Sequence, residues 1–137
     1  MSLLNVFNIA GSGLSAQSMR LNTTASNIAN ADSVSSSSNT VYRARYPVFS
    51  AYVDDVSNQY SAPKVRLEGI VESQSPLRMQ YRPDHPMANE DGNVFMPNVN
   101  AVEEMANMIS ASRSFQTNIE IMNTSKQMLL KTLSLGQ

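Results

Sequence analysis

Apolar residues recur every seven positions in the N-terminal part of the chain, the spacing expected for one face of a long helix. The members of this first stripe are Phe7, Leu14, Leu21 and Ile28. A helix of about 25 to 30 residues is predicted here, on the order of 40 Å long. The positions between the stripe residues are mainly Ser, Thr, Asn and Gln rather than Glu and Lys. Such a surface costs little to desolvate, and we therefore expect other chains to cover it.

A second seven-residue repeat runs through the C-terminal part of the chain. Asn100 and Glu103 predict where its helix begins, because an Asn side chain caps free amides and the helix dipole favours an early acidic residue. The predicted helix spans about 35 residues, or roughly 50 Å, with Lys126 and Lys131 in its last turns and Gly136 after its end. The stripe comprises Met105, Met108, Phe115, Ile119, Met122, Leu129 and Leu133.

The middle of the chain has the pattern of short strands separated by turn-forming segments. Residues 41–53 are rich in aromatic and β-branched side chains, and residues 64–72 and 77–81 alternate polar with apolar positions. Three or four strands are expected, with Pro47 at a sheet edge or a break. The Ser-rich residues 33–39 are predicted to be a linker from the first helix to this sheet.

A helix at each end of one chain can pair with the other only if the middle loops out and returns. We therefore predict an α+β fold, in which long N- and C-terminal helices pair as a coiled-coil-like stem and carry a small β-rich insert. The expected division is residues 1–33 and 98–137 for the two helices of the stem domain, and 34–97 for the insert with its linker. Either the stem is a self-sufficient hairpin, or it packs against other subunits.

Composition favours the second alternative and excludes several function classes. Only 15% of the 137 residues are charged, against roughly 25% in a usual soluble domain. Ten Lys and Arg against eleven Asp and Glu leave a net charge of −1, too little to hold a nucleic-acid backbone. With no cysteine and a single histidine, disulfides, thiolate chemistry and multi-His or Cys-based metal sites are excluded. Residues 1–16 do not have the pattern of a secretory signal peptide, and no apolar run reaches the length of a membrane span.

Candidate catalytic and ligand-binding chemistry is weak. His85 lies between two prolines, where Asp84 or Ser75 could assist a general base, but the chain has no G-x-S-x-G nucleophile motif. We interpret His85 as a loop residue and keep a small hydrolase as a remote alternative. Residues 89–92 are interpreted as a turn rather than a calcium loop, and residues 11–13 as a flexible joint rather than a phosphate loop. No enzyme activity, cofactor or metal is expected.

Specific motifs in both helices resemble those of the flagellar axial proteins of the rod and hook. Residues 25–33, ASNIANADS, resemble the A-x-N-[IL]-A-N-x-x-[ST] segment of that family, and Tyr42-Arg43-Ala44 follows at the family's Y-R/K-x element. Residues 96–100, MPNVN, and 112–118, SRSFQTN, are similar to its C-terminal block. The residues that carry the motif are Asn27, Ile28, Ala29, Asn30, Pro97, Asn98, Val99, Arg113, Phe115 and Asn118.

The resemblance runs from end to end and implies a function. The short length of the chain and its closing residues are most similar to those of the proximal-rod members. This resemblance implies a structural subunit that assembles helically around the export channel and transmits torque from the motor toward the hook. The implied partners are copies of itself, the rod proteins FlgB, FlgF and FlgG, the adaptor FliE and the type III export apparatus, with no nucleic acid and no membrane span. The implied location is the periplasm-spanning rod of the basal body, reached without a cleaved signal peptide. The alternatives are another rod subunit or a type III-secreted coiled-coil adaptor.

Overall fold

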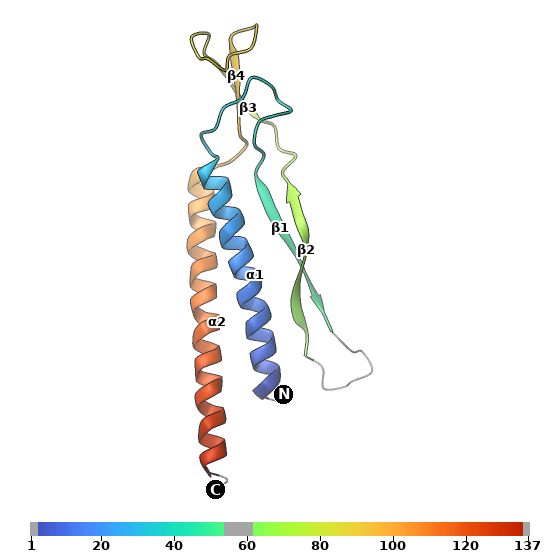
Figure 1. Cartoon of the computed structure of the whole chain (residues 1–137), viewed down its shortest axis with the longest axis vertical. Helices are drawn as coiled ribbons and strands as arrows, with labels where there is room; N and C mark the ends of the chain where they lie inside the picture. Colours follow the sequence, from blue (N-terminus) through green and yellow to red (C-terminus); the bar gives the residue numbers. More distant parts are fainter. Residues whose placement is uncertain (1–2, 54–61, 136–137) are drawn as a thin grey trace.

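The structure is a computed structural model that describes residues 3–53 and 62–135. Two long helices and two small antiparallel sheets form an α+β fold (Figure 1). Helix α1 spans Leu3–Ala29 and helix α2 spans Ala101–Leu135, and they lie side by side and antiparallel. In Figure 1 the C-terminal end of α2 continues past the N-terminal end of α1.

The start of α2 was predicted correctly from its capping residue. Asn100 Oδ1 accepts hydrogen bonds from the backbone amides of Val102 at 3.2 Å and Glu103 at 3.5 Å. Lys126 and Lys131 lie in the last turns of α2, as predicted, although the final turn of the described helix, which ends at Leu135, holds no basic residue. The predicted stop at Gly136 lies outside the described residues.

Helix α1 is continuous through residues 11–13, the segment predicted to be a flexible joint within the first helix. The two glycines have different surroundings. A Cβ atom on Gly13 would lie 3.1 Å from Asn118 Nδ2 on α2, whereas a Cβ on Gly11 would meet no atom within 4 Å. Gly13 therefore permits a close approach of the two helices, and Gly11 does not serve that purpose.

The predicted single sheet is instead two separate two-stranded sheets. Strands β1 (Arg45–Tyr52) and β2 (Lys64–Glu72) pair antiparallel and lie along α1 (Figure 1). The register shifts between Val48 and Phe49, which are paired with Gly69 and Leu67. β1 has one neighbour, so Pro47 is in an edge strand as predicted.

The second sheet stands beyond the ends of the helices that lie next to the insert (Figure 1). Its strands are β3 (Arg78–Tyr81) and β4 (Asn93–Met96). The Ser-rich segment is more than a linker, because Ser35 and Phe95 exchange two backbone hydrogen bonds of 2.9 Å. These bonds fix the segment after α1 to the free side of β4.

The described core is small and lies where the helices meet the insert. Ala31, Ala44 and Val99 form a buried cluster, with Tyr42 and Ala101 packed against it. Val94 is fully buried at β4. Most large apolar side chains of the stem are only partly buried or exposed, so hydrophobic burial within one chain is limited.

Candidate functional site

A buried amide joins the two helices to the insert. Asn27, at the last turn of α1, has no exposed surface. Its Nδ2 donates to the backbone oxygen of Arg45 at 2.9 Å and to Glu104 Oε2 at 3.0 Å. Its Oδ1 accepts from the Tyr42 hydroxyl at 2.8 Å and the Arg45 amide at 2.9 Å. Both donors and both acceptor positions are used, so one side chain holds α1, α2 and β1 together.

The carboxylate of Glu104 is the buried charge at this junction, and both its position and its hydrogen bonds stabilise it. Glu104 is 2% exposed and lies in the first turn of α2, where the helix dipole favours a carboxylate. Burial raises the pKa of Tyr46, and the negative charges of Glu104 and Glu103, with a hydrogen bond to Glu104, raise it further. Burial also raises the pKa of Tyr42, partly offset by the nearby Arg45 guanidinium, which stacks 5.4 Å from the centre of its ring.

Two further side chains fasten the insert through backbone atoms. Asn98 Oδ1 accepts from the Ala44 amide at 2.9 Å, and its Nδ2 donates to carbonyl oxygens of the segment before β3. Arg78 Nε donates to the carbonyl of Pro97 at 3.2 Å, and its Nη2 donates to that of Ala31 at 3.3 Å. Asn27, Asn98 and Arg78 thus tie the insert to both helix ends.

The face of α2 toward α1 is small and polar. Its buried residues are Glu104, Ala111 and Ser125, spaced in multiples of seven, and the half-buried Asn118 continues the series beside Gly13. We call these four α2 positions the polar seam. The predicted apolar stripe residues are half-buried rather than central: Phe7, Leu14, Leu21, Ile28, Met108, Phe115, Met122 and Leu129. The apolar pattern of the sequence does not show the seam, although the seam has the same seven-residue spacing.

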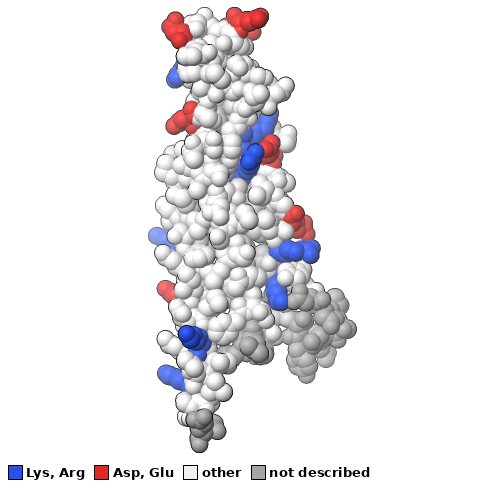
Figure 2. Space-filling view, in the orientation of Figure 1, with Lys and Arg blue, Asp and Glu red and all other residues white. Residues whose placement is uncertain are grey.

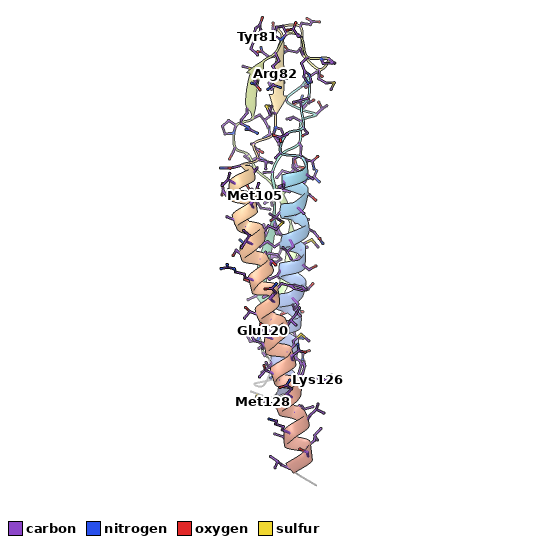
Figure 3. The ribbon with its side chains drawn as sticks, turned by 90° about the vertical axis from the view of Figure 1, so that its left-hand side faces the viewer. Tyr81, Arg82, Met105, Glu120, Lys126 and Met128 are labelled. Carbon is purple, nitrogen blue, oxygen red and sulfur yellow. The ribbon has the colours of Figure 1, made fainter. Side chains whose placement is uncertain are left out.

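A third surface of α2 is apolar and exposed. Its residues lie on one line of three- and four-residue steps along the helix, and all of them are exposed. The line is interrupted on both sides of Ile119, where Ser112, Gln116, Asn123 and Lys126 occupy it. We call this set the outer stripe: Val102, Met105, Ile109, Ile119, Leu130 and Leu133. Its exposure ranges from 39% at Ile119 to 75% at Val102. Figure 3 shows α2 from its left-hand side in Figure 1, with Met105 labelled. The predicted Met105, Ile119 and Leu133 belong to it, whereas Val102, Ile109 and Leu130 were missed.

Known proteins match the chain along its whole length. The family model described as "Flagella basal body rod protein" matches residues 7–35, and "Flagellar basal body rod FlgEFG protein C-terminal" matches residues 90–135. The flagellar basal-body rod protein FlgC of Salmonella typhimurium is 51% identical over the full length of both chains. FlgC of Escherichia coli O6:H1 is 50% identical, and FlgC of Buchnera aphidicola subsp. Acyrthosiphon pisum is 43% identical, again over all of each chain.

The chain belongs to the FlgC family of flagellar basal-body rod proteins. It is a structural subunit of the bacterial flagellar rod. The two family matches cover most of α1 and α2 and include the junction residues Asn27, Asn98 and Glu104. The FlgC proteins of Salmonella, Escherichia and Buchnera are all named as rod proteins and not as enzymes.

The motif residues of this FlgC-family chain divide into two groups. Asn27, Pro97, Asn98 and Val99 meet at the junction, and Asn30 Nδ2 bonds the Ser26 carbonyl at the end of α1. Ile28 is half-buried and Ala29 is exposed. Arg113, Phe115 and Asn118 lie along α2, away from the junction. The motif therefore encodes much of the contact between stem and insert, which the sequence pattern alone did not show.

The candidate catalytic residue lies in the loop between β3 and β4. His85 Nδ1 accepts a hydrogen bond from the Met87 amide at 3.1 Å, which places the histidine in a turn. Ser75 lies at the junction, where its carbonyl accepts from Asn98. Among the described residues there is no cluster of His, Asp and Glu that could hold a metal ion, and neither helix is long and apolar enough to cross a membrane.

Proposed function

We propose that this FlgC-family subunit assembles helically around the export channel in the proximal rod and transmits torque from the motor toward the hook. The outer stripe of α2 is the observation that carries the proposal. Ile109 is 55% exposed and Leu133 is 63% exposed, in a helix whose other face already packs on α1. Burial of such apolar surface against neighbouring subunits is favourable, and the spacing suits a neighbouring helix.

The polar parts of the stem also favour packing between subunits. Arg20 is the one charged residue of α1, and its Nη2 donates to Asn107 Oδ1 on α2 at 3.2 Å. The remaining polar positions of α1 are Ser, Thr, Asn and Gln, which lose less hydration energy on burial than charged groups. A neighbouring subunit can therefore cover this helix without leaving unpaired charges behind.

Torque would pass from one subunit to the next through their packed surfaces, and no catalytic step would be needed. In this proposal the helices of residues 1–33 and 98–137 pair as a coiled-coil-like inner domain around the channel, and residues 34–97 lie outside it. The β1–β2 hairpin lies along α1 and leaves the outer stripe of α2 open, which supports that arrangement (Figure 1). The hydrogen bonds of Asn27 to Arg45 and of Asn98 to Ala44 hold the insert to the stem, so a force on one is passed to the other.

The proposed neighbours are other copies of the chain, FlgB, FlgF, FlgG and FliE. The subunit would reach the periplasm-spanning rod through the type III apparatus without a cleaved signal. Membership of the rod family supports assembly with rod proteins in general.

Complementation of a strain that lacks the gene tests the proposal. The deletion strain is expected to build the membrane ring without distal rod, hook or filament, and the wild-type gene should restore them. Ile109→Asp should fold but fail to enter the basal body, because a carboxylate would be buried in an apolar contact. Ser110→Asp, on the adjacent exposed position, is the matched control and should restore swimming. Hooks in the deletion strain, or normal incorporation of Ile109→Asp, would contradict the proposal.

A further inference from the structure

The two ends of the molecule carry opposite charge. We call residues 82–92 the tip and residues 126–135 the foot. The tip holds Asp84, Glu90 and Asp91 against Arg82, whereas the foot holds Lys126 and Lys131 and no acidic residue. Figure 2 shows acidic side chains at one end of the long axis and basic side chains near the other.

The tip presents its carboxylates on an ordered loop. The Arg82 amide donates to the Gly92 carbonyl at 2.9 Å, which closes the loop. Asn89 Oδ1 accepts from the amides of Asp91 at 3.1 Å and Asn93 at 2.8 Å. Gly92 has a φ of 74°, which the loop requires at that position. Within the part of the chain that the structure describes, none of the tip carboxylates forms an ion pair.

Each end also exposes large apolar side chains beside its charges. Tyr81 is 70% exposed next to the tip, and Met79 and Met87 are exposed with it. Leu135 is 86% exposed at the foot and is not part of the outer stripe. Figure 3 shows Tyr81 and Arg82 at one end of the molecule and Lys126 and Met128 toward the other. Each surface thus combines apolar area with a charge of one sign, as protein interfaces do.

These surfaces cannot meet within one chain, because α2 alone separates them by roughly 50 Å. The lysines of the foot are not placed to offset the helix dipole either, since the last turn of α2 has no basic residue. Only a second molecule can bring a surface of the tip kind against one of the foot kind.

We propose that the tip receives the C-terminal helix end of a neighbouring axial subunit, an end that carries lysine and leucine as this chain's own foot does. This inference rests on the proposed rod assembly and names one of its axial contacts. Tip and foot are different surfaces, so the contact is heterologous and can repeat along an axis without closing. The family match over residues 90–135 is to the C-terminal segment of other flagellar rod proteins, so a segment similar to α2 occurs in proteins of the kind that the proposed function makes neighbours.

Site-directed cross-linking in assembled basal bodies tests the contact. The chain has no cysteine, so Met87→Cys provides one attachment site in the tip for a benzophenone maleimide. Irradiation should join the tip to a peptide from the C-terminal helix of an axial subunit, identified by mass spectrometry. Glu68→Cys, on the β1–β2 hairpin, is the matched control and should not give that peptide. Tip adducts only to other segments or to non-axial proteins would overturn the proposal.

Charge reversal tests the chemistry of the same contact. Glu90→Lys combined with Asp91→Lys should lower the C-terminal-helix adduct at least about tenfold, because lysine would then face lysine. Glu68→Lys should leave the yield unchanged, and circular dichroism confirms that each variant is folded. An unchanged yield in the double variant would overturn the electrostatic contact. These failures leave the subunit in the basal body, whereas its absence from wild-type basal bodies would instead refute the proposed function.

Discussion

Glu104 Oε2 accepts a hydrogen bond from Asn27 Nδ2 at 3.0 Å and so joins α2 to α1 across 77 positions of the chain. Both side chains are buried. Because the apolar residues of the stem are mostly half-buried, apolar packing alone leaves several helix registers similar in energy. A buried polar pair has one satisfied arrangement, and this pair therefore selects the register of the stem.

Replacement of Asn27 tests the importance of this pair. Asn27→Ala would leave Glu104, the Tyr42 hydroxyl and two backbone groups of Arg45 without their partner. The free energy of unfolding is expected to fall by about 3 kcal/mol in urea titrations. Asn22→Ala, on an exposed position of the same helix, should change it by less than about 0.5 kcal/mol. Equal effects of the two variants would contradict the assigned role.

The two glycines of α1 are predicted to respond differently to alanine. Gly11→Ala should stabilise the chain by about 1 kcal/mol, because alanine favours the helix and its Cβ meets no atom within 4 Å. Gly13→Ala should gain less or lose stability, because its Cβ must displace Asn118. Thermal melting followed by circular dichroism compares them. A larger gain at Gly13 than at Gly11 would show that the helices do not approach closely there.

Alkaline pH should weaken the junction. Burial raises the pKa of Tyr42 and Tyr46 above the ordinary value of 10.0, so the folded state binds these phenolic protons more tightly than the unfolded state. Their contribution is fully present below about pH 10 and is lost as pH rises through the folded-state pKa. Melting temperatures should therefore fall as the pH rises above about 10. Tyr46→Phe should make that fall shallower, whatever its effect at neutral pH, and an unchanged slope would refute the assignment.

Acidic substitutions in the half-buried stripes should affect the chain differently from those in the outer stripe. Leu21→Asp and Phe115→Asp are expected to lower the melting temperature of the purified chain and to block its incorporation, since they place a carboxylate among partly buried apolar groups. Phe115→Leu is the conservative control and should retain swimming. Normal melting and normal motility of the Asp variants would show that these faces are not packing surfaces.

The helices were predictable because their signals are local. The seven-residue repeats and the Asn100 cap depend on residues within a few turns, and the observed α1 and α2 agree with them. The polar seam could not be predicted, because burial of Glu104 depends on Asn27, which lies far away in sequence. The bridge between Ser35 and Phe95, which brings the Ser-rich segment to β4, likewise joins residues far apart in the sequence.

The outer stripe illustrates a different limit. Met105, Ile119 and Leu133 were predicted as packing residues, but the sequence could not separate them from the half-buried Met108 and Phe115 on the same helix. Only the position of α1 shows which apolar side chains are covered within the chain and which remain for a neighbour. Which apolar residues of α2 are covered and which are exposed is therefore determined by the packing of the two helices together and not by the sequence of either helix alone.

A density map of the assembled basal body at side-chain resolution tests the central claim most directly. We expect α1 and α2 of each subunit to pair in the inner layer around the channel, with Val102, Ile109 and Leu130 against helices of neighbouring subunits and the β1–β2 hairpin outside. A map in which the outer stripe faces solvent, or in which the hairpin lines the channel, would contradict it.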